Sequence, residues 1–348
     1  MLTGSLNESA LPGRYMVKAA SERIAPFVRP VTLQAVGAGP ADRARLCLAF
    51  ESMQFSGSFK AREAVNFAAY YLERGMMPQA GIVLGDAGHG NAALACAWAA
   101  RRTGARATVF VRGHIDRATL ARLHGFGATV HTAHGCRDDI LKAARAHATA
   151  MGALFAHPHE HPLIVAGAGT LAAEIDELVG SEIDTVVVPV GGGALLAGTC
   201  AALEHTGIRV VAVELEGRRT LSQALAISQV LAAGGDPAPS TAHKLPRTTV
   251  SLARAVGCVP VSVSRQQVGT ARRVIWEQWR MAVEPVAAMA FAAIQTGAYQ
   301  PDVYENVVAM VTGANTNPGD LMARPRTSVR VTRPHLPLRL RSTAGRAL

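Results

Sequence analysis

Short apolar strands alternate with helical segments through most of this chain of 348 residues. We expect buried strands at 81–84 and 108–111 with an alanine-rich helix at 92–102 between them, and the same order recurs at 128–151 and 185–215. Continuous apolar strands separated by helices indicate parallel sheets covered by helices on both faces. The expected fold class is therefore α/β, and the length favours two domains.

One lysine stands out among the residues that could carry chemistry. The chain has four lysines against 31 arginines, and arginine cannot replace lysine where a deprotonatable amine or a Schiff base is needed. Lys60 lies in the segment SGSFKAR, where small residues precede an amphipathic helix. Small neighbours allow a planar cofactor to approach, so Lys60 is the candidate covalent attachment site.

Small-residue loops follow three of the expected strands. The run 191–193 is three glycines between a strand and a helix, which presents several backbone N–H groups to one point and suits a phosphate. It lacks the Lys-Ser/Thr pair of a Walker loop, so a monophosphate on a cofactor fits better than a triphosphate. The segments GHGN at 88–91 and VTGAN at 311–315 also follow strands, where open parallel sheets bind ligands.

In this order and spacing, these segments resemble the fold-type II pyridoxal-phosphate enzymes, above all the threonine and serine dehydratases and serine racemase. The family's lysine motif is similar to SGSFKAREAVN at 56–66, and five further family motifs follow collinearly between residues 88 and 315. These matches lie at 88–92, 157–175, 189–195, 283–288 and 312–315. The resemblance covers roughly residues 20 to 320.

The resemblance implies a cofactor, pyridoxal 5′-phosphate, and a role for each matching residue. Lys60 would form the Schiff base and Phe59 would pack beside the ring, with Asn91 on the ring hydroxyl and Thr312 on the pyridine nitrogen. Phosphate binding would fall to Gly191, Gly192, Gly193 and Ala194, with Leu195 beside them. The substrate would lie against Ser58, Gly88, His89 and Gly90.

The implied reaction is the elimination of a β-substituent, expected to be a hydroxyl, from a small amino acid. Lys60 would remove the Cα proton, and the products would be a 2-keto acid and ammonia. Alternatives are β-replacement of the threonine synthase type, or diaminopropionate ammonia-lyase-like elimination or racemisation with His89 as a second acid or base. A non-catalytic protein that keeps the cofactor fold is an alternative of a different class.

The chain departs from the family pattern at several positions. His89 stands where dehydratases usually have alanine, and it either acts as an acid or base or only lines the carboxylate pocket. Glu63 replaces a family glycine, and glutamate is well tolerated in the first turn of a helix. The segment 241–258 does not match the family's substrate-closing motif, and no regulatory domain is expected after Asp320.

The resemblance implies a discontinuous large domain at 1–45 and 152–322, a small domain at 46–151, and the cofactor in the cleft between them. Seven arginines and no acidic residue follow Asp320, so most of the net charge of +10 falls in a basic tail at 323–348, which we expect to be disordered. The partner is therefore expected to be a small amino acid rather than nucleic acid or membrane. Five singly spaced cysteines indicate a cytoplasmic protein, and the family precedent favours a homodimer.

Two further patterns are not interpreted as sites. His157, His159 and His161 alternate near two prolines and are expected to form a surface loop rather than a metal site. The GAGTLA pattern at 167–172 lacks the acidic residue that a dinucleotide-binding unit needs after its next strand.

Overall fold

The computed structural model describes residues 11–36, 45–218, 220–232 and 245–322. They form two sheets, a larger one with strand order β1-β2-β10-β7-β8-β9 and a smaller one with order β5-β4-β3-β6. The strands of the larger sheet are β1 (Thr32–Val36), β2 (Arg45–Phe50), β7 (Thr185–Pro189), β8 (Arg209–Leu215), β9 (Val259–Val263) and β10 (Asn306–Val311). Those of the smaller sheet are β3 (Ile82–Asp86), β4 (Ala107–Arg112), β5 (Thr129–Ala133) and β6 (Leu154–Phe155).

Helices lie between successive strands from β2 onward. The helices are α1 (Arg14–Ile24), α2 (Lys60–Glu73), α3 (Asn91–Thr103), α4 (Arg117–Gly125), α5 (Arg137–Met151), α6 (Pro162–Val179), α7 (Ala194–Leu203), α8 (Thr220–Ala232), α9 (Arg247–Ala255), α10 (Arg265–Trp279), α11 (Met289–Gln295) and α12 (Gly319–Met322). No helix in the described ranges combines the length and apolarity that a membrane span requires.

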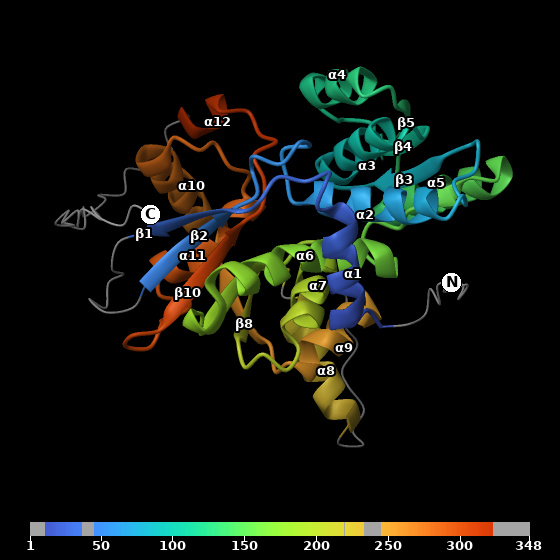
Figure 1. Ribbon diagram of the computed structural model, residues 1–348. Helices are drawn as coiled ribbons and strands as arrows, with labels where there is room; N and C mark the ends of the chain where they lie inside the picture. Colours follow the sequence, from blue (N-terminus) through green and yellow to red (C-terminus); the bar gives the residue numbers. More distant parts are fainter. Residues whose placement is uncertain (1–10, 37–44, 219, 233–244, 323–348) are drawn as a thin grey trace, which may run out of the picture.

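The expected α/β class with parallel sheets is confirmed. Every strand pair is parallel except the edge pair β1 and β2, which runs antiparallel with Thr32 opposite Phe50. Crossover helices are needed between parallel strands, which explains the strand–helix alternation in the sequence. The larger sheet lies at the left of Figure 1 and the smaller one at the upper right, with α2 and α6 between them.

Alternate residues of the larger sheet face two different helix layers. On β7, Val186 and Val188 pack in the core that contains α1, α2, α6 and α7, whereas Val187 packs in the core that contains α10 and α11. The first core continues through α3 to Ile82 and Leu84 of the smaller sheet. Side chains of one strand point alternately to opposite faces, so both faces of β7 are buried.

The glycines of the GAGTLA pattern allow close helix packing. A Cβ at Gly167 would lie 2.8 Å from the Cα of Glu63 on α2, and a Cβ at Gly169 would lie 2.6 Å from the carbonyl oxygen of Gly198 on α7. Both glycines lie inside α6 rather than in a strand-to-helix turn. The pattern therefore serves the contact of α6 with its two neighbouring helices.

The sheets do not follow the expected domain boundaries at either end of the small domain. The strand Arg45–Phe50 belongs to the larger sheet, because it pairs with β1 and β10. Leu154–Phe155 pairs with β3 in the smaller sheet, although it lies after residue 151. The division into a discontinuous large domain and a small domain remains a proposal, and the expected tail at 323–348 lies outside the described residues.

Candidate active site

Three neighbouring parallel strands end at one edge of the larger sheet. β10 lies between β2 and β7, and the loops 51–59, 312–315 and 190–193 follow the carboxyl ends of these strands. This edge is where open parallel sheets place ligands. The candidate residues that are far apart in the sequence therefore meet at one edge.

Lys60 lies at the start of α2, directly after the loop that follows β2. Its Nζ lies 2.6 Å from Oε2 of Glu63 and 3.4 Å from the carbonyl oxygen of Pro158. The ring centroid of Phe59 is 5.0 Å from the same nitrogen. The Lys60 side chain is only 12% exposed, so its amine is held in a confined polar space.

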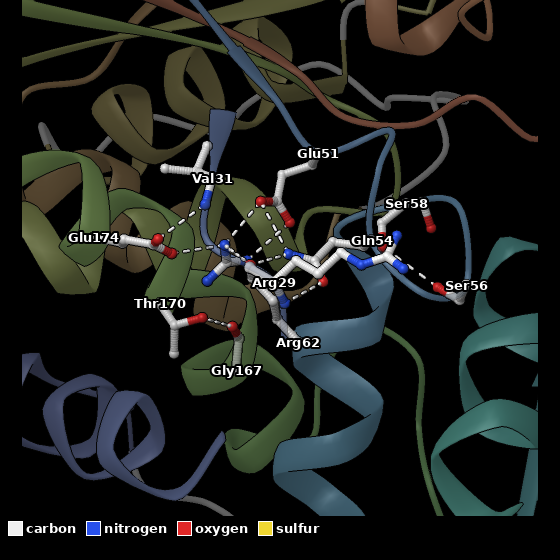
Figure 2. Close-up of polar contacts among 10 residues, drawn as sticks. All are labelled: Arg29, Val31, Glu51, Gln54, Ser56, Ser58, Arg62, Gly167, Thr170 and Glu174. Carbon is white, nitrogen blue, oxygen red and sulfur yellow. Dashed lines mark hydrogen bonds and ion pairs between the residues drawn. The ribbon is translucent and has the colours of Figure 1, made fainter. Parts of the chain in front are cut away.

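A buried ionic network fixes the helix that carries Lys60. The Arg62 side chain is 2% exposed and binds both oxygens of Glu51 at 2.8 Å and Glu174 of α6 at 2.7 Å (Figure 2). Gln54 donates to the carbonyl oxygen of Arg29 in the same network. A guanidinium paired in this bidentate way holds its partners in a defined geometry, so the network fixes the position of Lys60 relative to β2 and α6.

The glycine run lies between β7 and α7 and has the conformation of a cradle. Gly193 has φ +99° and caps α7, a backbone conformation that favours glycine. A Cβ at Gly193 would lie 2.6 Å from Oγ1 of Thr249, and a Cβ at Gly192 would lie 2.1 Å from Cε1 of His159. The backbone conformation of Gly193 requires glycine, whereas a side chain at Gly192 would displace the His159 ring. The backbone N–H groups at the start of α7 suit an anion.

Three enclosed polar atoms here lack partners among the described residues, two of them against this cradle and one at the loop that follows β10. Oγ1 of Thr249, Nδ1 of His159 and Oγ of Ser58 are enclosed and make no hydrogen bond within the described part of the chain. Buried polar atoms are normally hydrogen-bonded. Together with the glycine cradle and the Lys60 amine, they fit a phosphorylated cofactor that carries a carbonyl group.

The expectation that the histidine-rich segment is a surface loop is wrong for two of its members. His159 is half-buried against Gly192, and its pKa lies well below the usual range because of burial and the nearby charge of Lys60. His161 is buried and its Nδ1 accepts from the backbone N–H of Leu163, which caps α6. The segment turns into the cleft because α6 begins at Pro162, directly behind it.

Asn91, at the start of α3, contacts two segments beside the larger sheet, one containing Glu284 and the other the loop 312–315. Its Nδ2 donates to Oε2 of Glu284 at 2.7 Å, and its Oδ1 accepts from Nδ2 of Asn315 at 2.6 Å. Glu284 also accepts from the backbone N–H of Asn315 at 3.0 Å. Burial raises the pKa of Glu284 to about 7, although these two hydrogen bonds oppose the rise.

The loop 87–90 between β3 and α3 is held by Asp86. The Asp86 carboxylate accepts from the backbone N–H groups of Gly88 and Ala93, and Gly90 has φ +94°. His89 is exposed and its side chain makes no hydrogen bond to any described residue. The structure therefore places Asn91 in the cleft, whereas the role of His89 remains a hypothesis.

The remaining candidates lie side by side at the edge of the larger sheet. Ser58 forms a β-bridge with Gly313, and the backbone N–H of Phe59 donates to the carbonyl oxygen of Thr312 at 3.0 Å. Thr312 is 6% exposed and follows β10 directly. Ala194 and Leu195 are buried at the start of α7, next to the cradle.

Arg122 of α4 reaches the same loops from the smaller sheet. Its guanidinium donates to Oδ1 of Asn315 and, at 3.1 Å, to the carbonyl oxygen of Ser56. The contact joins helix α4 to two loops of the larger sheet.

The motif comparison missed four residues of the site. Glu63 was expected only to be tolerated, although its spacing of three residues from Lys60 is a pattern that places two helical side chains together. Thr249 lies in the segment that does not match the family, Glu284 was noted only within its motif, and His159 was assigned to a surface loop. No local signal in the sequence identifies these last three.

Comparisons with known proteins identify the family of the chain. The family model described as pyridoxal-phosphate dependent enzyme matches residues 25–313. The mouse protein named serine dehydratase-like is 31% identical over 79% of this chain and 82% of its own length. The L-threonine ammonia-lyase of Thermotoga maritima is 30% identical over 71% of this chain and 62% of its own length.

Solved structures show the same fold. The threonine deaminase from T.th. superimposes with a TM-score of 0.74 at 27% identity, covering 88% of this chain and 99% of that one. Maize serine racemase has a TM-score of 0.78 at 23% identity, covering 90% and 96%. The chain belongs to the family of pyridoxal-phosphate-dependent enzymes, and its cofactor is pyridoxal 5′-phosphate.

Within that family, the chain is a lyase of the dehydratase and ammonia-lyase class, as the sequence predicts. The relatives named here that are at least 25% identical carry dehydratase, deaminase or ammonia-lyase names. They favour elimination over the replacement, racemisation and non-catalytic alternatives.

Proposed function

We propose that this enzyme eliminates the β-hydroxyl of a small amino acid, serine or threonine, and releases a 2-keto acid and ammonia. The observation that carries the proposal is the position of the Lys60 amine in a confined polar space, on the carbonyl oxygen of Pro158, next to which His159 lies against Gly192 of the glycine run. The names of the serine dehydratase-like and threonine ammonia-lyase relatives support the substrate class.

In this proposal, the bound cofactor supplies a carbonyl that condenses with amines and a conjugated ring that stabilises the electron pair left when the Cα–H bond breaks. Lys60 would hold the cofactor through its amine, and the same Nζ would take the Cα proton of the substrate. Its confinement beside Pro158 and Phe59 keeps the amine near the reacting carbon and limits the access of water.

The other candidates would bind and orient. The backbone N–H groups of 191–194 would bind the phosphate, with Leu195 beside them, while Phe59 would pack beside the ring and Asn91 would bind the ring hydroxyl. The Thr312 hydroxyl would hydrogen-bond the ring nitrogen and leave it largely unprotonated, which favours elimination over transamination. We propose that the substrate carboxylate binds the loop 88–90 and Ser58, whose Oγ lacks a partner within the described residues.

A product assay tests the proposed reaction. Keto acid and ammonia are measured with L-serine, L-threonine and their D-enantiomers for the wild type, Lys60→Ala and His89→Ala. We expect equal amounts of both products from at least one L-substrate, and none with Lys60→Ala. Cofactor binding without any product from this panel would contradict the proposal.

The same assay tests His89. If His89 only lines the carboxylate pocket, His89→Ala raises KM and leaves the ratio of L- to D-substrate turnover unchanged. Loss of D-substrate turnover alone would instead assign His89 an acid or base role.

We also propose that the enzyme works as a homodimer in the cytoplasm, on a small-molecule substrate and without nucleic acid or membrane partners. The cysteines are unpaired, as expected in a reducing compartment. Light scattering of the purified protein tests the dimer.

A further inference from the structure

Glu63 contacts the amine of Lys60 at a position where the family resemblance predicts glycine. The two residues lie one turn apart on α2, and Oε2 of Glu63 is 2.6 Å from Nζ of Lys60. The Glu63 side chain is only 3% exposed. Gly167 packs directly against the backbone of Glu63 and encloses it from the side of α6.

Lys60 is the only described group that compensates the Glu63 charge. Oε1 of Glu63 is enclosed and makes no hydrogen bond within the described residues. Burial raises the pKa of Glu63 to about 7, and the charge of Lys60 opposes this rise. Above that pH, the carboxylate therefore depends on a positive charge at Nζ.

The other titratable and charged groups near Nζ do not replace Glu63. His159 and His157 come from the loop before α6, and burial together with nearby positive charges lowers the pKa of both rings, so they are neutral. Arg137, at the start of α5, adds a positive charge that also acts on His159. Within the described ranges, Glu63 is the one carboxylate at ion-pair distance from Nζ.

We propose that Glu63 is a positioning residue that raises the affinity of the Lys60 nitrogen for a proton and thereby strengthens Lys60 as a base. This inference rests on the proposed function, in which Lys60 holds the cofactor and removes the Cα proton. In that step the C–H bond breaks, its electron pair stays on the substrate, and the proton forms a new N–H bond on Nζ. The adjacent carboxylate stabilises the resulting ammonium, because opposite charges in a confined site attract strongly.

The same carboxylate acts on the resting enzyme. The nitrogen of Lys60 also carries a positive charge when it is bonded to the cofactor and protonated, and this charge makes the attached carbon more reactive toward the substrate amine. Glu63 is expected to keep that nitrogen protonated to a higher pH than a neutral side chain would. The carboxylate acts in the same direction on the free amine and on the cofactor-bonded nitrogen, since a nearby carboxylate raises the pKa of a cationic nitrogen.

The test is a pH titration of the visible absorbance of the cofactor-bound enzyme, because protonation of the bonded nitrogen changes the colour. The variants are Glu63→Gln, Glu63→Asp and, as a control on the same helix, the exposed Glu73→Gln. We expect the absorbance of Glu63→Gln to titrate at least about one pH unit below that of the wild type. Glu63→Asp keeps the charge but holds it farther from Nζ, so the pH at which its absorbance titrates should lie between those of the wild type and Glu63→Gln. Glu73→Gln should titrate at the wild-type pH.

Catalysis gives a second measurement of the same effect. The kcat of Glu63→Gln should fall about tenfold or more, in step with the loss of proton affinity, while Glu63→Asp recovers part of it. Circular dichroism and thermal unfolding confirm that each variant is folded. Should Glu63→Gln not fold, Glu63→Asp alone decides, because its weaker ion pair must still shift the titration downward.

The inference is overturned if Glu63→Gln, or Glu63→Asp in its place, binds the cofactor and titrates at the wild-type pH. That outcome leaves the role of Lys60 intact. Failure of the proposed function has a different signature, since the wild type would then bind no cofactor, or bind it without releasing keto acid and ammonia.

Discussion

Asn91 and Glu284 lie 193 residues apart in the chain, yet Nδ2 of Asn91 donates a hydrogen bond of 2.7 Å to the Glu284 carboxylate. Asn91 begins α3, which packs on the smaller sheet. Glu284 is 8% exposed and lies in the segment between α10 and α11, two helices that pack on the larger sheet. The bond therefore joins the two sheets at the cleft. Because Asn315 bonds to both side chains, the three residues form one unit at the expected position of the cofactor ring.

Removal of the Asn91 side chain should weaken cofactor binding. Asn91→Ala leaves Glu284 and Asn315 each without one partner, and a buried group left unpaired costs about 1–3 kcal/mol. We expect the Kd for pyridoxal phosphate to rise between about 5-fold and 150-fold, measured by absorbance titration. Asn306→Ala, at the opposite end of β10, serves as the control and should leave the Kd unchanged.

Glu284 should make stability depend on pH. Its pKa rises from 4.5 to about 7 in the folded protein, so the folded state binds the proton more tightly and the free energy of unfolding falls as the pH rises from 4.5 to 7. At about 1.4 kcal/mol per pH unit, ionisation of this carboxyl costs about 3 kcal/mol. Glu284→Gln should remove this part of the pH dependence.

The measurement is urea unfolding at pH 5 and pH 7. The raised pKa of Glu63 also lowers the free energy of unfolding between pH 5 and pH 7, and it does so equally in the wild type and in Glu284→Gln. The difference in pH dependence between these two proteins therefore reports on Glu284. Glu277→Gln, an exposed glutamate on α10, is the control. Equal pH dependence in the wild type and Glu284→Gln would show that Glu284 ionises normally.

Alanine substitutions at Gly193 and Gly191 should have different effects. Gly193→Ala places a Cβ against Thr249 at a φ of +99°, which costs about 1–2 kcal/mol before any steric clash is counted. We expect lower thermal stability and a loss of phosphate binding. Gly191→Ala introduces a Cβ with no described atom within 4 Å, so it should fold like the wild type. Equal cofactor affinity of Gly193→Ala and the wild type would exclude this loop as the phosphate site.

The Arg62 network should contribute more to the free energy of unfolding than a surface ion pair does. Arg62→Ala leaves Glu51 and Glu174 as uncompensated charges, and breaking a buried pair costs about 3–5 kcal/mol. The control is Arg14→Ala, which removes an exposed ion pair with Asp176 and should cost at most about 1 kcal/mol. Chemical unfolding at neutral pH measures both losses, and equal losses would contradict the role assigned to the network.

Arg122 should hold α4 against the cleft. Arg122→Ala removes the donors to Asn315 and Ser56, so we expect faster amide hydrogen exchange in α4 and in the loop 51–59. The exposed Arg117→Ala, on the same helix, should leave this exchange unchanged. Exchange is measured by mass spectrometry, and an unchanged pattern in Arg122→Ala would show that the contact does not restrain α4.

Much of the fold follows from the sequence because its signals are local. The apolar runs around 82–86, 107–112 and 185–189 become strands, and the segments between them become helices. The segments bearing Asn91, the glycine run and Thr312 follow strands as expected, and the segment bearing Lys60 follows the strand Arg45–Phe50. The antiparallel edge strand Thr32–Val36 was not expected, because its half-exposed residues give no continuous apolar run.

The sequence indicates less of the site than of the fold, because the site depends on contacts between distant segments. His159 enters the cleft only because α6 starts at Pro162, and Thr249 reaches Gly193 only because α9 packs on α7. Charge and side-chain volume at those positions do not reveal either contact. Glu63 is the exception, since its spacing from Lys60 predicts the ion pair that the structure contains.

The central claim, that Lys60 holds pyridoxal phosphate in this enzyme, is tested most directly by the visible absorbance of wild type and Lys60→Ala. Each purified protein is mixed with excess pyridoxal phosphate, freed of unbound cofactor by gel filtration, and scanned. We predict a visible band in the wild type that borohydride reduction fixes to the peptide containing Lys60, and no retained band in Lys60→Ala. An equal band in both proteins, or none in either, would contradict the claim.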